Sequence, residues 1–251
     1  MYSNGYIFRF AIIMVVIVAA LLSGASMVLK PMQEKNVTTE KMQNILAAAE
    51  VVAGKENTLE LYNQYIVREV VLNLEGNEVC RFEAGKLITG ECRAFDIELK
   101  TQLKNLQAWQ AGNKQAQVML PLYVFNDGEK TLYIIPMQGK GLWGPIYGTI
   151  ALEEDLNTIF GAVFSHKGET PGLGAEIAQK DFQDQFKNKQ LYDDGTFVSI
   201  NVVKGGVANS NINPLHGVDA ISGGTITSNG VTEMLKSTFE LYVPYFEKRR
   251  L

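Results

Sequence analysis

The run "DAISGGTITSNG", which begins at Asp219, has the residue types that could bind a phosphate group. Gly223 and Gly224 let the backbone approach a ligand closely, and the apolar spacing that follows predicts a helix. The start of a helix offers unpaired backbone N–H groups and the positive end of the helix dipole, which together favour an anion. Thr225 would present its hydroxyl group to that phosphate.

Three further segments could complete such a site. "NVVKGG" supplies a cation, Lys204, and the loops "GLWGPIYG" and "HKGETPGLG" supply Leu142, Trp143, Pro171 and Leu173. Apolar and aromatic side chains of this kind can enclose a flat ring, while a polar end remains for the phosphate. The plainer interpretation is that the glycines form ordinary turns and that Trp143 belongs to the core or to an interface.

Other chemistry has little support. The two histidines, His166 and His216, have no Ser/Asp order or paired ligand that would predict a triad or a metal site, and His166 reads as a loop residue. Glu169 could orient nearby backbone N–H groups, although a surface position is the default for Glu. No GxGxxG follows a strand and no cysteine cluster occurs, so neither a dinucleotide site nor an iron–sulfur centre is indicated. The net charge of -4 argues against nucleic-acid binding.

The N-terminus predicts a membrane anchor. Residues 10–29, "FAIIMVVIVAALLSGASMVL", carry no charge, and about 20 helical residues span a hydrocarbon core of roughly 30 Å. A cleaved signal peptide is the alternative, because "SGAS" supplies small residues, but the apolar run is longer than signal peptides usually have. A short stub, residues 1–9, precedes the anchor, and no later segment reaches membrane length, so we expect an exported C-terminal domain.

After the anchor, "NVTTEKMQNILAAAEVVAG" predicts a helix capped by Thr38 or Thr39 and stopped at Gly54. The middle of the chain mixes β-like runs such as "EVCRF" with a helical stretch near "FDIELKTQLKNLQ". Cys80 and Cys92 could form a disulfide in an oxidising compartment, or could remain two reduced core thiols.

From Val118 onward the pattern favours strands. The runs are "VMLPLYVFND", "KTLYIIPMQG", "YGTIALEED" and "FVSINVVKG", and "NDGEK" between the first two predicts a hairpin. A final helix follows with Ser228 or Asn229 as its cap. We therefore expect an α+β fold with a mainly antiparallel sheet, in which residues 30–117 form a membrane-proximal mixed region and residues 118–251 a ligand-binding domain.

"DAISGGTITS" closely resembles the target motif of flavin transferases: Asp, two residues, Ser or Thr, Gly, usually Ala, then Thr. The resemblance implies that Asp219, Ser222, Gly223 and Gly224 form the motif, and that Thr225 receives flavin mononucleotide (FMN) through a phosphodiester bond. The sequence departs from the pattern at Gly224, where a small residue without a side chain replaces Ala and makes the loop more mobile.

The anchor, "GKGLWGPIYGTIAL", "HKGETPGLGAEI" and the flavin motif occur in the order found in the C subunit of the sodium-translocating NADH:quinone oxidoreductases, and this resemblance covers nearly the whole chain. The G subunit of the electron-transport complexes that couple ferredoxin and NAD shares part of these motifs. A membrane-anchored, non-redox ligand-binding module is the alternative from another class.

The resemblance to the C subunit implies an electron-carrying subunit of a complex in the bacterial inner membrane, with its soluble domain on the periplasmic side. It also implies other subunits as partners, contact with membrane lipid, and a flavin transferase, since no base is evident beside Thr225 that would activate its hydroxyl. The expected FMN-binding residues are Leu142, Trp143, Glu169, Thr170, Pro171, Gly172, Leu173, Gly174, Lys204, Asp219, Ser222, Gly223, Gly224, Thr225 and Thr227.

Overall fold

The structure, a computed structural model, describes residues 3–250, so the first two residues of the expected N-terminal stub lie outside the described residues. The chain forms two compact units, one up to residue 42 and one from residue 43 onward. Within the described residues, all strands belong to the second unit.

Helix α1 (Asn4–Ala48) begins within the expected stub and includes the whole expected anchor. Its most apolar window has a mean hydropathy of 2.7 and is entirely exposed, and α1 alone among the helices of residues 3–250 is long and apolar enough to cross a membrane. The exposed large apolar side chains of α1 extend from Tyr6 to Val37. An uninterrupted apolar helix of this kind is stable where lipid covers it.

The prediction of a separate helix after the anchor is wrong, because α1 continues through both segments. The hydroxyl of Thr39 does not cap a helix; it donates to the carbonyl of Lys35 at 2.9 Å, inside the helix. The residues between the two segments include Pro31, but the helix continues through it, and most of their neighbours are good helix formers. α1 ends before Gly54, at Ala48, where Glu50 adopts a left-handed conformation with φ 63°.

The main sheet has seven strands in the order β3-β2-β1-β4-β5-β6-β7, and all neighbouring pairs are antiparallel. The strands are β1 (Ile66–Leu72), β2 (Glu78–Glu83), β3 (Lys86–Thr89), β4 (Leu120–Asn126), β5 (Thr131–Lys140), β6 (Pro145–Leu152) and β7 (Ile159–His166). The expected hairpin joins β4 to β5, where Asn126 pairs with Thr131. The mainly antiparallel α+β fold is confirmed.

Shorter elements complete the second unit. They are α2 (Thr58–Tyr65), α3 (Leu99–Gln110), α4 (Lys180–Gln183), β8 (Tyr192–Asp193), β9 (Thr196–Phe197), β10 (Asn201–Val203), β11 (Gly217–Asp219), and 3-10 turns at Ala94–Asp96, Gly174–Ala178, Asp184–Phe186, Val207–Asn209 and Pro214–His216. α3 and β2 confirm the predicted helical and β-like runs of the middle region. The run "FVSINVVKG" was expected to be one strand but is divided between β9 and β10, because Ser199 has φ 60° and interrupts the extended backbone.

The sheet extends across the expected boundary between residues 117 and 118. Strands β1, β2 and β3 precede this boundary, and β1 pairs directly with β4, which follows it. A β-sheet is held together by hydrogen bonds between strands, so the two sides of the boundary share one sheet.

Strand β7 was not among the strands expected from the sequence.

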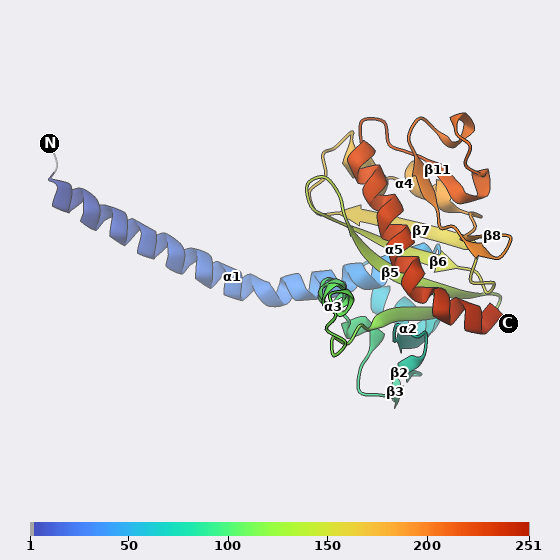
Figure 1. Cartoon of the computed structure of the whole chain (residues 1–251). Coiled ribbons are helices and arrows are strands. Elements are labelled where there is room, and N and C mark those ends of the chain that lie inside the picture. The colour runs from blue at the N-terminus through green and yellow to red at the C-terminus, as the bar shows by residue number, and fades with distance from the viewer. Residues whose placement is uncertain (1–2, 251) are drawn as a thin grey trace. The chain divides into compact units, whose positions relative to one another are not determined.

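The C-terminal helix α5 (Thr225–Arg250) packs against the sheet and forms the core with it. Figure 1 shows α5, in red, crossing the strands β5 and β6. Its fully buried side chains include Val231, Leu235, Phe239 and Phe246. The close approach is visible at Gly230, where an added Cβ atom would lie 2.2 Å from the carbonyl oxygen of Lys140. The sheet therefore determines the position of α5.

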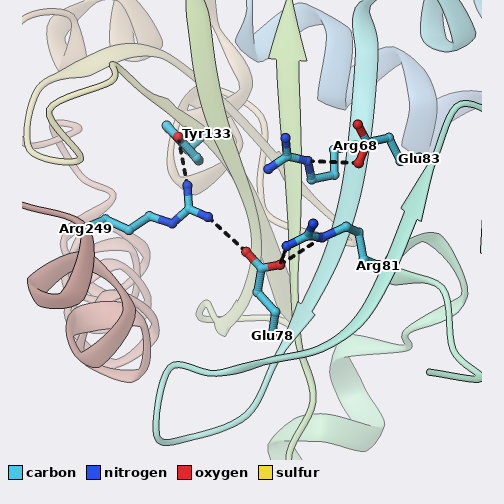
Figure 2. Close-up of polar contacts among 6 residues, drawn as sticks. All are labelled: Arg68, Glu78, Arg81, Glu83, Tyr133 and Arg249. Atoms are coloured by element: carbon cyan, nitrogen blue, oxygen red, sulfur yellow. Dashed lines mark hydrogen bonds and ion pairs between the residues drawn. The ribbon is translucent and has the colours of Figure 1, made fainter. Parts of the chain in front are cut away.

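Polar contacts hold the far end of α5 against β2 (Figure 2). Arg249 donates to Glu78 at 2.9 Å and to the hydroxyl of Tyr133 at 3.3 Å. The other carboxylate oxygen of Glu78 accepts from Arg81 on the same strand at 3.0 Å. We call Arg249, Glu78, Arg81 and Tyr133 the C-terminal clamp.

The two cysteines form a disulfide, Cys80–Cys92, with their Cα atoms 5.7 Å apart. This resolves the choice that the sequence left open between a disulfide and two free thiols. The bond connects β2 to the segment after β3, so it closes the hairpin at the edge of the sheet.

Candidate functional site

The turn before α5 differs from the prediction in one respect: the helix begins at Thr225, so neither Ser228 nor Asn229 is its cap. The carbonyl of Gly224 accepts the first helical hydrogen bond, from the Ser228 N–H at 2.9 Å, which makes Gly224 the N-cap residue. Gly223 has φ 73° and turns the backbone into the helix. The Ser228 hydroxyl is buried and accepts from the Ile221 N–H at 3.2 Å, which closes the turn. We call residues 221–225 the acceptor turn.

This earlier helix start strengthens the argument for an anion site. Thr225 is the first residue of α5 and is half-buried, while Ser222 and Gly223 are exposed. The backbone N–H groups in the first turn of a helix have no partners within the helix, and a helix of this length has a substantial dipole. The hydroxyl of Thr225 therefore lies where a phosphate group is favoured.

A buried carboxylate connects three of the predicted segments. Glu169 is 5% exposed; its Oε1 accepts from the Trp143 N–H at 2.8 Å, and its Oε2 accepts from the Thr227 hydroxyl at 2.5 Å. The backbone N–H of Glu169 in turn donates to Nδ1 of His166 at 3.1 Å. Glu169 is thus an internal residue, and the default surface position does not apply to it.

Two glycines make room for this carboxylate. A Cβ atom on Gly141 would lie 2.5 Å from Glu169 Oε1, and one on Gly174 would lie 2.4 Å from both Glu169 Oε2 and the Thr227 hydroxyl. Real Cβ atoms do not approach other atoms so closely, so an alanine at either position would displace the carboxylate or its partner. Gly174 was predicted to belong to the site, whereas Gly141 was not singled out.

The predicted apolar residues remain exposed. The exposed fractions are 49% for Leu142, 69% for Trp143 and 42% for Leu173. Leu173 lies against the acceptor turn, because a Cβ atom on Gly223 would be 2.6 Å from its Cδ2. Ile226 is 58% exposed and was not among the site residues predicted from the sequence. Its position between Thr225 and the buried Thr227, at the helix start, could have identified it. Exposed large apolar side chains beside a polar turn, such as Leu173 and Ile226, are typical of a ligand site.

The loop that contains Leu173 is a compact, hydrogen-bonded turn. The carbonyl of Thr170 accepts from the N–H groups of Leu173 and Ala175, both at 3.1 Å. Gly172 has φ 74° and donates its N–H to the carboxylate of Glu176 at 2.8 Å. Pro171, like Thr170 and Gly172, is exposed, so this loop presents its outer surface to solvent.

Asp219 and Lys204 lie at the end of the parallel pair β10 and β11, where Val203 pairs with Asp219. The carboxylate of Asp219 accepts from the Val207 N–H at 2.7 Å, so it anchors the loop that begins at Lys204. Lys204 itself is exposed. Asp219 therefore supports the strand that leads into the acceptor turn.

The structure thus brings together most of the predicted residues. Glu169 joins the segments of Trp143 and Thr227 by hydrogen bonds, and Leu173 contacts the acceptor turn. Thr227 is only 1% exposed and uses its hydroxyl for Glu169, so its side chain supports the turn from inside. For Lys204, the structure records no hydrogen bond or ion pair with the acceptor turn within residues 3–250.

Comparison with known proteins adds independent findings. The model of the FMN-binding domain family matches residues 141–240, which include every predicted site residue. The C subunit of the Na+-translocating NADH-quinone reductase from Haemophilus ducreyi is 31% identical over 94% of this chain and 91% of its own length. The corresponding subunit from Vibrio alginolyticus is 33% identical over 89% of this chain and 84% of its own length.

A solved structure shows the same fold. The crystal structure of the C subunit of the Na+-translocating NADH-quinone reductase from Parabacteroides distasonis is 35% identical and superimposes with a TM-score of 0.72. The match covers 87% of this chain and 96% of the other chain. The fold similarity therefore extends well beyond the segment that the domain model matches.

Proposed function

This chain belongs to the family of the C subunits of the Na+-translocating NADH-quinone reductases, and from that premise we propose that it carries FMN in a phosphodiester bond to Thr225. As a member, it is a subunit of an oxidoreductase complex, and it has an FMN-binding domain. The observation that carries the proposal is the position of Thr225, the first residue of α5 and the residue that matches the acceptor of the flavin-transferase motif.

The helix start suits the phosphate of FMN. A phosphodiester retains one negative charge, which the unpaired N–H groups and the dipole of α5 stabilise. Gly223 and Gly224 have no side chains that would come between the backbone and the phosphate, and Lys204, which is exposed on the loop after β10, offsets its charge. Asp219 and Ser222, which complete the motif, are exposed and available to the transferase.

The attachment is a phosphoryl transfer that needs an activated donor. The Thr225 oxygen forms a bond to the flavin phosphorus and loses its proton, while a phosphoanhydride bond in a flavin dinucleotide breaks and releases a nucleoside monophosphate. Free FMN would have to lose water instead, which is unfavourable in aqueous solution. Because a threonine hydroxyl is a weak nucleophile without an adjacent base, a separate flavin transferase supplies the activation.

The exposed apolar side chains suit the flat ring system of FMN. Leu142 and Trp143, from the loop whose backbone Glu169 binds, and Leu173, beside the acceptor turn, offer exposed aromatic and aliphatic surface. The compact loop Thr170–Gly174 holds Leu173 in place. Glu169 and Thr227, both buried, support the Trp143 loop and the start of α5 from inside the protein.

FMN supplies the redox chemistry, and the protein supplies attachment, orientation and surroundings. A tether through the phosphate prevents exchange of the cofactor and leaves the ring system unaltered. We propose that the protein relays electrons to the next flavin-carrying subunit, during quinone reduction that is coupled to sodium export. NADH, quinone and sodium are then bound by partner subunits.

The same premise gives a location. We propose that α1 crosses the inner membrane in contact with lipid and with partner subunits, and that the second unit lies on the periplasmic side. The disulfide Cys80–Cys92 supports this side, because disulfides persist in oxidising compartments and are rare in the bacterial cytoplasm.

The test is mass spectrometry of the full chain, produced in a bacterium that also makes a flavin transferase. We expect a mass increase of one FMN less one water, mapped to the peptide with Thr225. The Thr225→Val variant has no hydroxyl and should stay unmodified, whereas Thr225→Ser keeps a hydroxyl and should be modified.

An unmodified, colourless chain under these conditions would contradict the proposal. It would favour a membrane-anchored, non-redox module that binds a phosphate-bearing ligand reversibly. Modification that persists in Thr225→Val would place the flavin on another residue.

A further inference from the structure

We propose, resting on the function above, that Glu169 is a positioning residue for flavin attachment: through Thr227 it holds the first turn of α5, and so the Thr225 hydroxyl, in the geometry that the transferase requires. Glu169 does this from inside the protein. It links the acceptor helix to the loop of Trp143 by using both of its carboxylate oxygens.

The two hydrogen bonds join segments that are distant in the sequence. The bond to the Trp143 N–H spans 26 residues, and the bond to the Thr227 hydroxyl spans 58 residues. Both donors are neutral, and within residues 3–250 no ion pair to Glu169 is recorded. A buried carboxylate is costly without partners, so its hydrogen bonds are strongly favoured, and bonds to a charged acceptor are stronger than neutral ones.

Two glycines lie close around the carboxylate. Gly141 and Gly174 form a socket in which a methyl group on either residue would collide with a Glu169 oxygen. The Thr227 hydroxyl lies beside the same Glu169 oxygen at the Gly174 contact, and Thr227 is itself 1% exposed. The carboxylate therefore has little freedom to move.

The restrained position of Glu169 affects Thr225 because Thr225 lies at the N-terminal end of helix α5. Helix ends fray, since their first residues lack the hydrogen bonds that hold the interior. Thr227 is in the same first turn as Thr225, two residues later. The hydrogen bond that Thr227 donates to Glu169 therefore opposes fraying of the turn in which the Thr225 hydroxyl must react. A nucleophile that is misplaced by about 1 Å can lose about 100-fold in rate.

The experiment measures the rate at which a purified flavin transferase modifies the purified full chain, by intact-mass spectrometry over time at saturating transferase. Thr227→Val removes the hydroxyl at nearly constant volume, and Gly174→Ala pushes the two partners apart without removing either. We expect both variants to lower the rate constant by about tenfold, since they break a hydrogen bond to a charged group. Thr227→Ser restores the hydroxyl and should restore the rate.

Two matched controls separate this role from general damage. Thr232→Val also removes a hydroxyl that links α5 to another segment, because the Thr232 hydroxyl accepts from the Val202 N–H at 2.9 Å. Thr232 lies further along the helix, away from Thr225. Gly168→Ala adds a methyl group to the same loop as Gly174, with no atom within 4 Å of the new Cβ. Both controls should be modified at the wild-type rate.

A second readout excludes a loss of folded protein. Unfolded chains lower the final extent of modification, whereas misplacement of Thr225 lowers the rate constant of the folded chains. Because Glu169 and Thr227 are buried, the transferase concentration for half-maximal rate should not change. Thermal unfolding of each variant confirms that it is folded at the assay temperature.

Wild-type rates in both Thr227→Val and Gly174→Ala, with Thr225 modified in the wild-type chain, would overturn the role of Glu169 and leave the proposed function intact. A failure of Thr227→Ser to restore the rate would also overturn it. If the wild-type chain itself stays unmodified, the proposed function fails, and the role of Glu169 falls with it.

Discussion

At the scale of single residues, the two glycines of the acceptor turn have different tasks. Gly223 adopts φ 73°, and a Cβ atom there would lie 2.6 Å from Leu173. Gly224 has no left-handed conformation, and its Cβ atom would be 3.0 Å from the half-buried side chain of Ile221 and 3.3 Å from the backbone of Leu173, which are tight contacts but no collision. The absence of a side chain is thus required at Gly223 and only convenient at Gly224.

We predict that Gly223→Ala and Gly224→Ala separate these tasks. Gly223→Ala should lower the free energy of unfolding by about 1 kcal/mol or more and should displace Leu173. Gly224→Ala should change the free energy of unfolding by less than about 1 kcal/mol, because the reduced entropy of the unfolded chain offsets a poorer helix cap. Urea unfolding checks both values.

Modification of Thr225 is the second measurement on this pair. Gly224→Ala restores the residue that is usual in the flavin-transferase motif, so the variant should still accept FMN. An unmodified Gly224→Ala chain that is fully folded would contradict the view that this position tolerates either small residue.

At the scale of elements, the C-terminal clamp secures α5 at the end opposite to Thr225. Arg249 joins the last turns of the helix to β2 through Glu78, 171 residues away in sequence, and to β5 through Tyr133. Lys248 adds a bond from the same turn of the helix to the carbonyl of Glu75, at 2.7 Å. Figure 2 shows that Glu78 also accepts from Arg81, so one carboxylate binds an arginine of its own strand β2 and an arginine of the helix.

We predict that Arg249→Ala lowers the free energy of unfolding by about 1 kcal/mol, because the clamp is a partly exposed network and not a single surface pair. The rate of Thr225 modification should stay unchanged, since the variant acts at the other end of the helix. Lys236→Ala removes an exposed charge from the same helix and serves as the control. Equal stabilities of the two variants would mean that the clamp contributes nothing measurable.

At the scale of the whole molecule, buried tyrosine hydroxyls connect distant parts of the second unit. Tyr242 of α5 donates to the carbonyl of Pro121 at 2.7 Å, and Tyr123 of β4 donates to the carbonyl of Ala94 at 3.2 Å. Tyr62 of α2 donates to the carboxylate of Glu69 at 3.0 Å. Burial raises the pKa of all three hydroxyls far above the ordinary value of 10.0, and for Tyr62 the nearby Tyr123 and Glu69 raise it further.

These shifts predict that alkaline pH destabilises the fold. In the unfolded chain a tyrosine loses its proton near pH 10, whereas in the folded chain these three keep theirs, so above about pH 10 the folded state binds more protons. The free energy of unfolding should then fall by up to about 1.4 kcal/mol per pH unit for each tyrosine, and should not depend on them below pH 10.

Urea unfolding midpoints measured from pH 8 to pH 11 test this prediction. The Tyr242→Phe variant has one such group fewer and should show a shallower decline. A midpoint that is constant above pH 10 would contradict the burial of these hydroxyls.

Much of the site was predictable because its signals are local. The Gly-rich turn before a helix, the proposed acceptor Thr225 and the apolar loops with Trp143 and Leu173 are visible as residue types in short runs. The predicted hairpin at residues 126–131 and the long apolar helix are equally local, since they depend on turn residues and on hydropathy. The family resemblance extended these signals to a cofactor.

The boundaries were less predictable. The helix start at Thr225 depends on a buried Ser228 that closes the turn, and the end of α1 depends on a left-handed Glu50. Neither conformation is favoured by the residue type alone, because packing around the backbone selects it.

By itself, the sequence determined the long apolar N-terminal helix, the antiparallel α+β class and the segments of the candidate site, because hydropathy and turn chemistry act between neighbouring residues. Only the tertiary structure decided that Cys80 bonds to Cys92, that β1 pairs with β4 across the expected boundary, and that Glu169 is an internal bridge. Each of these depends on atoms that are distant in the chain and meet only when the sheet and α5 pack together, so no local pattern records them.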